Sequence, residues 1–145
     1  MKIENIFPSF SESILWLIAI GQIKLGIDAT SGWCFQLGTR VIMLKTRDDM
    51  IPLLPLLEMG KTKFFAHLVN ISEQYPKYAV FVFPEELLLK CAFETSVSDY
   101  WPNKAIDWLE SDSGVSEELR ESLKLIMHQR WVGQRLKQRI ARRLK

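Results

Sequence analysis

The sequence is poor in the residues from which disulfides, metal sites and nucleophilic centres are usually built. It has only two cysteines, Cys34 and Cys91, and only two histidines, His67 and His128. Two cysteines cannot make a disulfide framework, and neither lies in a CxxC pair or at a metal-ligand spacing from a histidine. We therefore expect free thiols in a reducing compartment, no metal site and no cofactor.

An apolar run long enough to cross a bilayer is also missing. The run near the N-terminus, residues 14–20, is much shorter than the roughly 20 residues that a spanning helix needs. Lys2 is offset by Glu4 and Glu12, so the run lacks the net-positive leader that precedes the core of a signal peptide. These features predict a cytoplasmic protein without a membrane span.

The common catalytic motifs are absent as well. Residues 60–62, Gly-Lys-Thr, match the end of a phosphate-binding loop, but Pro55 stands where that loop needs its first glycine. Asp107 and Glu110 are three residues apart, a spacing that would suit a catalytic pair of carboxylates. The same spacing is expected of charged residues on the solvent-facing side of a helix, and we favour that interpretation. We predict that the protein is not an enzyme. An enzyme whose site is assembled from distant residues is the second alternative, because spacing arguments do not detect such sites.

What the sequence does contain is typical of one folded domain. It has 145 residues, of which 48% are hydrophobic and 25% charged. A chain of this size and composition can bury a substantial core. There is no repeat of fixed period that would divide it into smaller units. We predict a single domain over residues 1–145.

Apolar residues recur at helical spacing along most of the chain. Residues 9–25 begin with serines that can cap a helix, and Ile14, Leu17 and Ile18 follow at spacings that share a helix face. Further helices are predicted over residues 61–75, 84–93, 100–111, 117–127 and 128–145. Short connections make neighbouring helices antiparallel. We predict a mainly α fold of stacked antiparallel helices, with HEAT-like and armadillo-like arrays as a fold-level analogy.

Two segments leave an α+β alternative open. Residues 33–45 are rich in aromatic and β-branched residues, yet Trp33 and Leu37 start a helical spacing, so we favour a helix. A β-hairpin turning at Gly38 is the alternative. Residues 78–83 have strand propensity, but six apolar residues cannot be distinguished from a buried helical segment. The fold is α+β if these segments are strands.

Charge is distributed unevenly along the chain. The net charge is +2, but all 17 Asp and Glu residues precede His128. Residues 128–145 contain seven Lys or Arg and are predicted to form a basic amphipathic C-terminal helix. Leu136 and Ile140 form an apolar stripe that would pack on the preceding helix. The side next to this stripe would present four arginines to solvent: Arg135, Arg139, Arg142 and Arg143.

From these features we predict a non-catalytic protein-interaction module whose basic helix binds an acidic surface of another protein. Arginine and tryptophan side chains supply much of the binding energy of protein interfaces. An inhibitor or immunity-type protein is one specific form of this prediction. The predicted contact residues are Arg135, Arg139, Arg142, Arg143, Trp101 and Trp108, and the two tryptophans are included on the condition that they are exposed.

Nucleic-acid binding through the same helix is the first alternative. Seven cations could neutralise several phosphates and give strong, salt-dependent affinity. The sequence favours a protein partner instead, because the rest of the chain is acidic and the isoelectric point of about 8.6 is lower than that of most nucleic-acid-binding domains.

Overall fold

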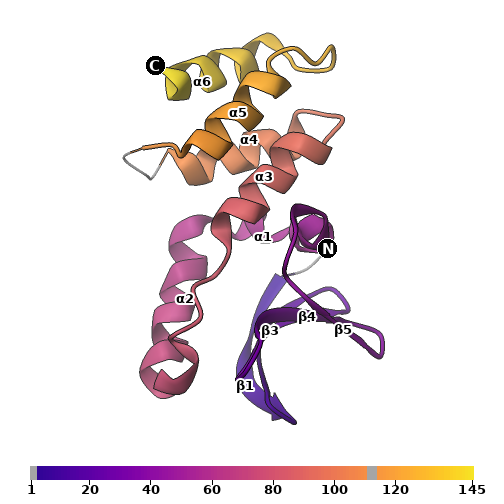
Figure 1. Cartoon of the computed structure of the whole chain (residues 1–145), viewed down its shortest axis with the longest axis vertical. Helices are drawn as coiled ribbons and strands as arrows, with labels where there is room; N and C mark the ends of the chain where they lie inside the picture. Colours follow the sequence, from indigo (N-terminus) through magenta and orange to yellow (C-terminus); the bar gives the residue numbers. More distant parts are fainter. Residues whose placement is uncertain (1–2, 111–113) are drawn as a thin grey trace.

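The computed structural model describes residues 3–110 and 114–145, and its described part begins with an antiparallel sheet (Figure 1). The strands are β1 (Ile3–Ser11), β2 (Ile14–Ile20), β3 (Ile23–Asp28), β4 (Gly32–Leu37) and β5 (Arg40–Met43). Each strand pairs with the next one along the chain, which gives the order β1-β2-β3-β4-β5. The prediction of a mainly α fold of stacked antiparallel helices is therefore wrong, and so is the assignment to the all-α class. The fold is α+β.

The largest error concerns residues 9–25, which form the end of β1, all of β2 and the start of β3. Side chains of β2 are buried on both faces of the sheet. Leu15 and Leu17 belong to the main core, whereas Ile14 and Trp16 belong to a second cluster. A strand that is buried on both faces is apolar at nearly every position, so its sequence also suits a buried helix. Burial on both faces explains the wrong prediction.

The hairpin alternative for residues 33–45 is correct. In this hairpin Leu37 pairs with Arg40, and Gly38 has a φ of 62° in the turn between β4 and β5. Two-residue hairpin turns need such positive φ angles, which glycine adopts without strain. Residues 78–83 are not a strand. They lie in a short 3-10 turn and an irregular connection, in which Val82 is exposed and Phe83 is buried.

The second cluster is a small apolar core on one face of the sheet. Trp16 pairs with Gly26, Gly26 with Cys34, and Cys34 with Met43, so these residues form one row across four strands. A Cβ atom on Gly26 would lie 2.6 Å from Cε3 of Trp16 and 2.7 Å from the carbonyl oxygen of Leu15. The indole ring can therefore cover β3 only because residue 26 has no side chain.

Replacing Gly26 with alanine is expected to destabilise the fold by about 1–3 kcal/mol, because the added methyl group overlaps a packed ring and a backbone oxygen. Urea denaturation measures this loss. Gly114→Ala is the matched control, since a Cβ there meets no described atom within 4 Å. Equal stability of the two variants would contradict the close packing of Trp16 on Gly26.

The turn between β3 and β4 depends on one carboxylate. Asp28 accepts hydrogen bonds from the backbone N–H groups of Thr30 (2.8 Å) and Ser31 (3.0 Å) and from the hydroxyl of Ser13 (2.8 Å). The bond from Thr30, followed by those from Ser13 and Ser31, lowers the pKa of Asp28 below its ordinary value. These hydrogen bonds therefore favour the ionised carboxylate.

The lowered pKa of Asp28 predicts a pH-dependent contribution to stability. An aspartate with a depressed folded-state pKa stabilises the fold above the unfolded-state pKa of about 3.9, and this contribution is lost as pH falls through the folded-state pKa. We expect Asp28→Asn to reduce stability at pH 7 and to flatten its dependence below about pH 4. Urea unfolding between neutral and acidic pH measures both effects. Asp48→Asn, at an exposed carboxylate, serves as the comparison.

The other regular elements of the described chain are helices. They are η1 (Arg47–Leu53), α1 (Leu56–Met59), α2 (Lys61–Gln74), η2 (Pro76–Tyr78), α3 (Glu85–Thr95), α4 (Tyr100–Leu109), α5 (Glu117–Ile126) and α6 (Gln134–Leu144). Ser116 caps α5 as predicted, because its hydroxyl accepts a hydrogen bond from the N–H of Leu119. The helix predicted over 128–145 begins only at Gln134. The predicted end at residue 111 lies outside the described residues.

The sheet and α2 lie at one end of the molecule, α4, α5 and α6 lie at the other, and α3 runs between them (Figure 1). We call α3 to α6 the helical half. A line of aromatic rings joins the two ends. Ring centroids are 5.0 Å apart for Trp33 and Phe83, 4.7 Å for Phe83 and Phe64, and 5.8 Å for Phe64 and Trp108. The sheet and the helical half therefore share one core. Among the described residues, no helix has the length and apolar character required to cross a membrane.

Candidate interaction site between α4 and α6

Helix α6 packs on the helical half with its apolar side inward. Leu136 and Ile140 are completely buried, and Leu144 is half-buried against the core. This orientation confirms the predicted docking of the apolar stripe. The guanidinium of Arg120 donates a hydrogen bond to the carbonyl oxygen of Leu144 at 2.7 Å. It thereby satisfies one of the carbonyl groups that every helix leaves open at its C-terminal end.

Arg139 holds α6 against α4. Its Nη2 atom lies 2.5 Å from Oδ1 of Asp107 and 2.8 Å from Oε1 of Glu110. Its Nη1 atom donates to Oδ1 of Asn103 at 3.0 Å. Burial lowers the pKa of Arg139, but the hydrogen bonds to Glu110 and Asp107 outweigh this effect and raise it above its ordinary value. Only 13% of the side chain is exposed, so Arg139 is mainly an internal clamp rather than a surface cation.

The other three predicted arginines differ in their surroundings. Arg135 and Arg142 are exposed, and within residues 3–110 and 114–145 neither forms an ion pair. Arg143 is half-buried and takes part in an interaction within the chain. Of the four predicted arginines, those that could reach a partner are therefore chiefly Arg135 and Arg142.

The two tryptophans predicted as contact residues also differ in how deeply they are buried. Trp108 is 1% exposed, and its indole N–H donates to the carbonyl oxygen of Leu57 at 3.1 Å. Trp108 is therefore a core residue, and it is excluded from the predicted contact residues because it was included only on the condition that it is exposed. Trp101 is half-buried and lies beside Tyr100, with ring centroids 4.8 Å apart. Tyr100 is 50% exposed and is the more accessible aromatic side chain of α4.

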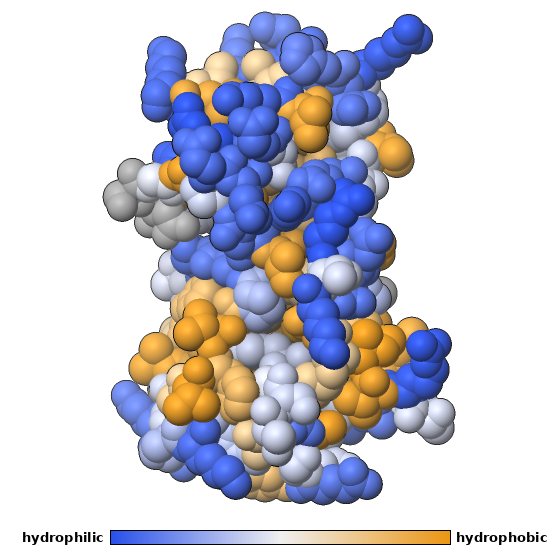
Figure 2. Space-filling view, viewed as in Figure 1, coloured by the Kyte–Doolittle hydropathy of each residue, from blue (hydrophilic) through white to orange (hydrophobic). Residues whose placement is uncertain are grey.

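A cleft of about 590 Å³ lies between the N-terminal part of α4 and the outer side of α6. Its lining residues are Ser98, Asp99, Tyr100, Asn103, Lys104, Asp107, Arg135 and Arg139. On the face shown in Figure 2, the surface over the helical half is largely hydrophilic, whereas apolar patches gather over the end formed by the sheet and α2. Residue spacing could not predict this cleft, because its two walls are about thirty residues apart in the chain.

The charges that line the cleft are only partly matched. Asp107 binds Arg139, and Asp99 accepts a hydrogen bond from the backbone N–H of Gly133 at 3.3 Å. Lys104 lies 5.8 Å from the centroid of the Tyr100 ring, and it forms no ion pair with a described residue. Lys104 and Arg135 are thus cations without a carboxylate partner in the described part of the chain. The cleft can bind an anionic group.

Other reactive side chains are occupied by structural contacts. Both cysteines are free and buried, Cys34 in the sheet and Cys91 in α3. Burial raises the pKa of the Cys34 thiol to about 11 and also raises that of Cys91, which disfavours the reactive thiolate. His67 makes a 2.9 Å hydrogen-bond contact to the carbonyl oxygen of Leu17, which links α2 to β2. In the described residues, no group of three or more His, Cys, Asp or Glu side chains is arranged to hold a metal ion.

The edges of the sheet are poorly suited to pairing with another chain. The edge strand β1 contains Pro8, and its register with β2 shifts between Asn5 and Ser9. The opposite edge strand, β5, has only four residues. Proline, bulges and short length all discourage edge-to-edge association. The cleft at the helical half is therefore the better candidate for an interaction site.

No family model, curated protein or solved structure matches this chain.

The clamp at Arg139 gives a direct prediction for stability. Arg139→Ala is expected to lower the free energy of unfolding by about 1–2 kcal/mol, because it removes charge-assisted hydrogen bonds that are partly screened by solvent. Arg142→Ala, at an exposed position of the same helix, is expected to change it by less than about 0.5 kcal/mol. Urea denaturation at low and high salt measures both values. Equal effects of the two substitutions would show that Arg139 does not hold α6 in place.

Proposed function

We propose that the protein is a non-catalytic protein-interaction module that binds an acidic surface of a partner through the α4–α6 cleft and the outer face of α6. The supporting observation is the mismatch of charge in the cleft. Asp99 and Asp107 are engaged within the chain, whereas Lys104 and Arg135 have no carboxylate partner among the described residues. Carboxylates of a bound protein would supply the missing partners.

The outer face of α6 extends this contact surface beyond the cleft. Arg135 and Arg142 are seven residues apart and so lie on the same side of the helix, about 10 Å apart along its axis. Tyr100 adds an exposed aromatic ring next to Lys104. Arginine and tyrosine are enriched among the residues that dominate binding energy at interfaces. A partner with an acidic ridge of this length fits the surface.

An inhibitor or immunity-type protein is one form of such a module, because covering the acidic surface of a partner is enough to block it. We further propose that the protein acts in the cytoplasm. Two free, buried thiols suit a reducing compartment.

Binding of a labelled peptide of alternating Glu and Asp, followed by fluorescence anisotropy at low salt, tests the proposal. Lys104→Glu with Arg135→Glu is expected to weaken binding about ten-fold, since each exposed charge pair contributes up to about 1 kcal/mol. The matched control, Lys24→Glu with Arg40→Glu, makes the same change in net charge on the exposed surface of the sheet and should bind like the native protein.

The same experiment separates the proposal from its nucleic-acid alternative. A labelled DNA duplex is titrated in parallel over a salt series. Tighter binding of the duplex than of the acidic peptide, lost in the cleft variant and steeply salt-dependent, would favour nucleic acid. Failure of the acidic peptide to bind even at low salt, or equal loss in both double variants, would refute the proposed site.

A further inference from the structure

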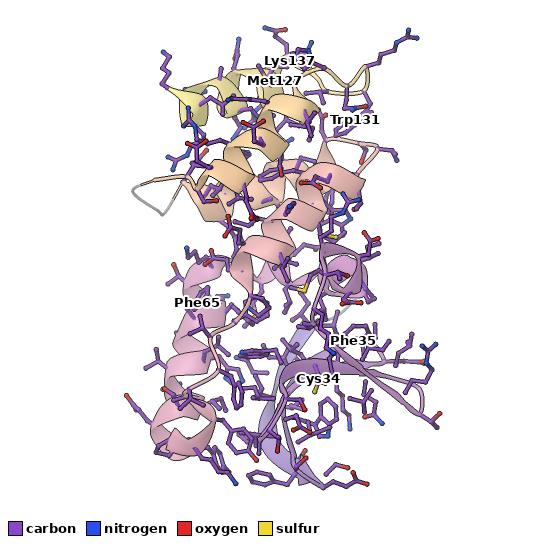
Figure 3. The ribbon with its side chains drawn as sticks, viewed as in Figure 1. Cys34, Phe35, Phe65, Met127, Trp131 and Lys137 are labelled. Atoms are coloured by element: carbon purple, nitrogen blue, oxygen red, sulfur yellow. The ribbon has the colours of Figure 1, made fainter. Side chains whose placement is uncertain are left out.

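An apolar groove of about 210 Å³ lies between α2 and the connection that leads to α3. Its walls come from α2, from residues 78–83, and from Ile27 and Trp33 of the sheet. Phe65 lines it from the part of α2 nearest to the helical half (Figure 3). The groove is smaller than the pockets of about 300–1,000 Å³ that enclose small-molecule ligands, but about 150 Å³ already accepts a group of the size of benzene. It therefore suits one or two small apolar side chains from another protein surface.

Three exposed valines surround this groove. Val69 is 54% exposed, Val80 is 73% exposed and Val82 is 85% exposed. Val69 and Val82 line the groove, and the neighbours of Val80 in the chain, Ala79 and Phe81, line it as well. Exposed apolar side chains that gather in one place mark surfaces that contact other molecules, whereas single ones do not. We call Val69, Val80 and Val82 the valine rim.

The connection that carries Val80 and Val82 is held in place from the sheet. The indole N–H of Trp33 donates a hydrogen bond to the carbonyl oxygen of Phe81 at 3.0 Å. The ring of Phe81 lies against Gly32, where an added Cβ would be 3.1 Å from the ring. The two valines on either side of Phe81 therefore stand on a fixed support, which lowers the entropy cost of docking them into another surface.

The charges beside the groove are of both signs. Glu73 at the end of α2 and Lys77 of η2 are each next in sequence to a groove residue, Ser72 and Tyr78 respectively. Both are exposed, and neither forms an ion pair with a described residue. In a two-fold contact between identical chains, residue i meets residue j and residue j meets residue i. Glu73 of each copy can therefore pair with Lys77 of the other.

We propose that the groove and its valine rim form a two-fold contact between two copies of this chain, in which Val82 of each copy enters the groove of the other. The surface carries both halves of such a contact: a hollow and, beside it, exposed apolar side chains of a size that fits. The opposite charges of Glu73 and Lys77 complete the self-complementarity.

This contact is expected to be weak and independent of the cleft. A few valines and one groove bury less than the roughly 800 Å² per partner of a standard interface, so the dimer should dissociate on dilution. The groove lies at the end formed by the sheet and α2, and it shares no lining residue with the α4–α6 cleft (Figure 1). The proposal therefore does not rest on the function proposed above.

Sedimentation velocity of the full chain over a series of protein concentrations tests the proposal. The native protein is expected to change from monomer to dimer without forming larger species, because a two-fold contact closes on itself. Val82→Asp should weaken the dimer at least about ten-fold, since it places an unpaired carboxylate in an apolar groove. Val97→Asp is the matched control, because Val97 is 81% exposed on the connection between α3 and α4. It should dimerise like the native protein, and both variants should keep the native urea midpoint.

Charge exchange tests the two-fold arrangement itself. Glu73→Lys alone and Lys77→Glu alone each place like charges opposite one another twice, and each should weaken self-association about 3- to 30-fold at low salt. A mixture of these two single variants again brings opposite charges together, so it should form a mixed dimer about as tightly as the native protein associates. The double variant that carries both exchanges should also dimerise like the native protein.

Several results would overturn the proposal. They are a monomer at every concentration, equal effects of Val82→Asp and Val97→Asp, open-ended association, or a mixture of the two charge variants that stays monomeric. An apolar dye that binds a monomeric native protein but not Val82→Asp would assign the groove to a different occupant.

Discussion

The line of aromatic contacts from Trp33 to Trp108 is the interaction on which the rest of the structure depends. Trp33 belongs to the sheet, and Trp108 belongs to α4. Phe83 and Phe64 connect them through ring contacts of 4.7 to 5.8 Å. Large rings bury much apolar surface and prefer such tilted and edge-to-face geometries. Because this line fixes α4 relative to the sheet, it also fixes the surface on which α6 docks.

Electrostatics then determine which charges of α6 remain available. Arg139 uses both carboxylates that face it on α4, and this pairing anchors the helix. The same pairing engages Asp107, and Lys104 on α4 and Arg135 on α6 have no carboxylate partner among the described residues. A single internal clamp thus explains two properties at once: the firm docking of a strongly basic helix, and the presence of unmatched cations beside it. Charge of this kind contributes specificity and association rate more than affinity.

Local sequence patterns predict an element correctly where that element is buried on one face only. Helices α2, α3 and α5 lie close to their predicted ranges, and the inward side of α6 was identified from Leu136 and Ile140. The patterns failed at residues 9–25, because burial on both faces of a sheet removes the alternation that marks a strand. They also could not reveal the partners of Arg139, since Asp107 and Glu110 lie 32 and 29 residues away. Both failures concern contacts between distant segments.

The α4–α6 cleft and the crevice lined by Phe93 and Trp131 share a structural support, the short connection between α3 and α4. Ser96 and Val97 line the crevice, and Ser98 and Asp99 line the cleft. Asp99 is in turn held by the backbone N–H of Gly133, at the start of α6. The position of this connection therefore sets the shape of both. Because this connection contributes to both, a substitution that moves it is expected to alter the shape of the cleft as well as that of the crevice.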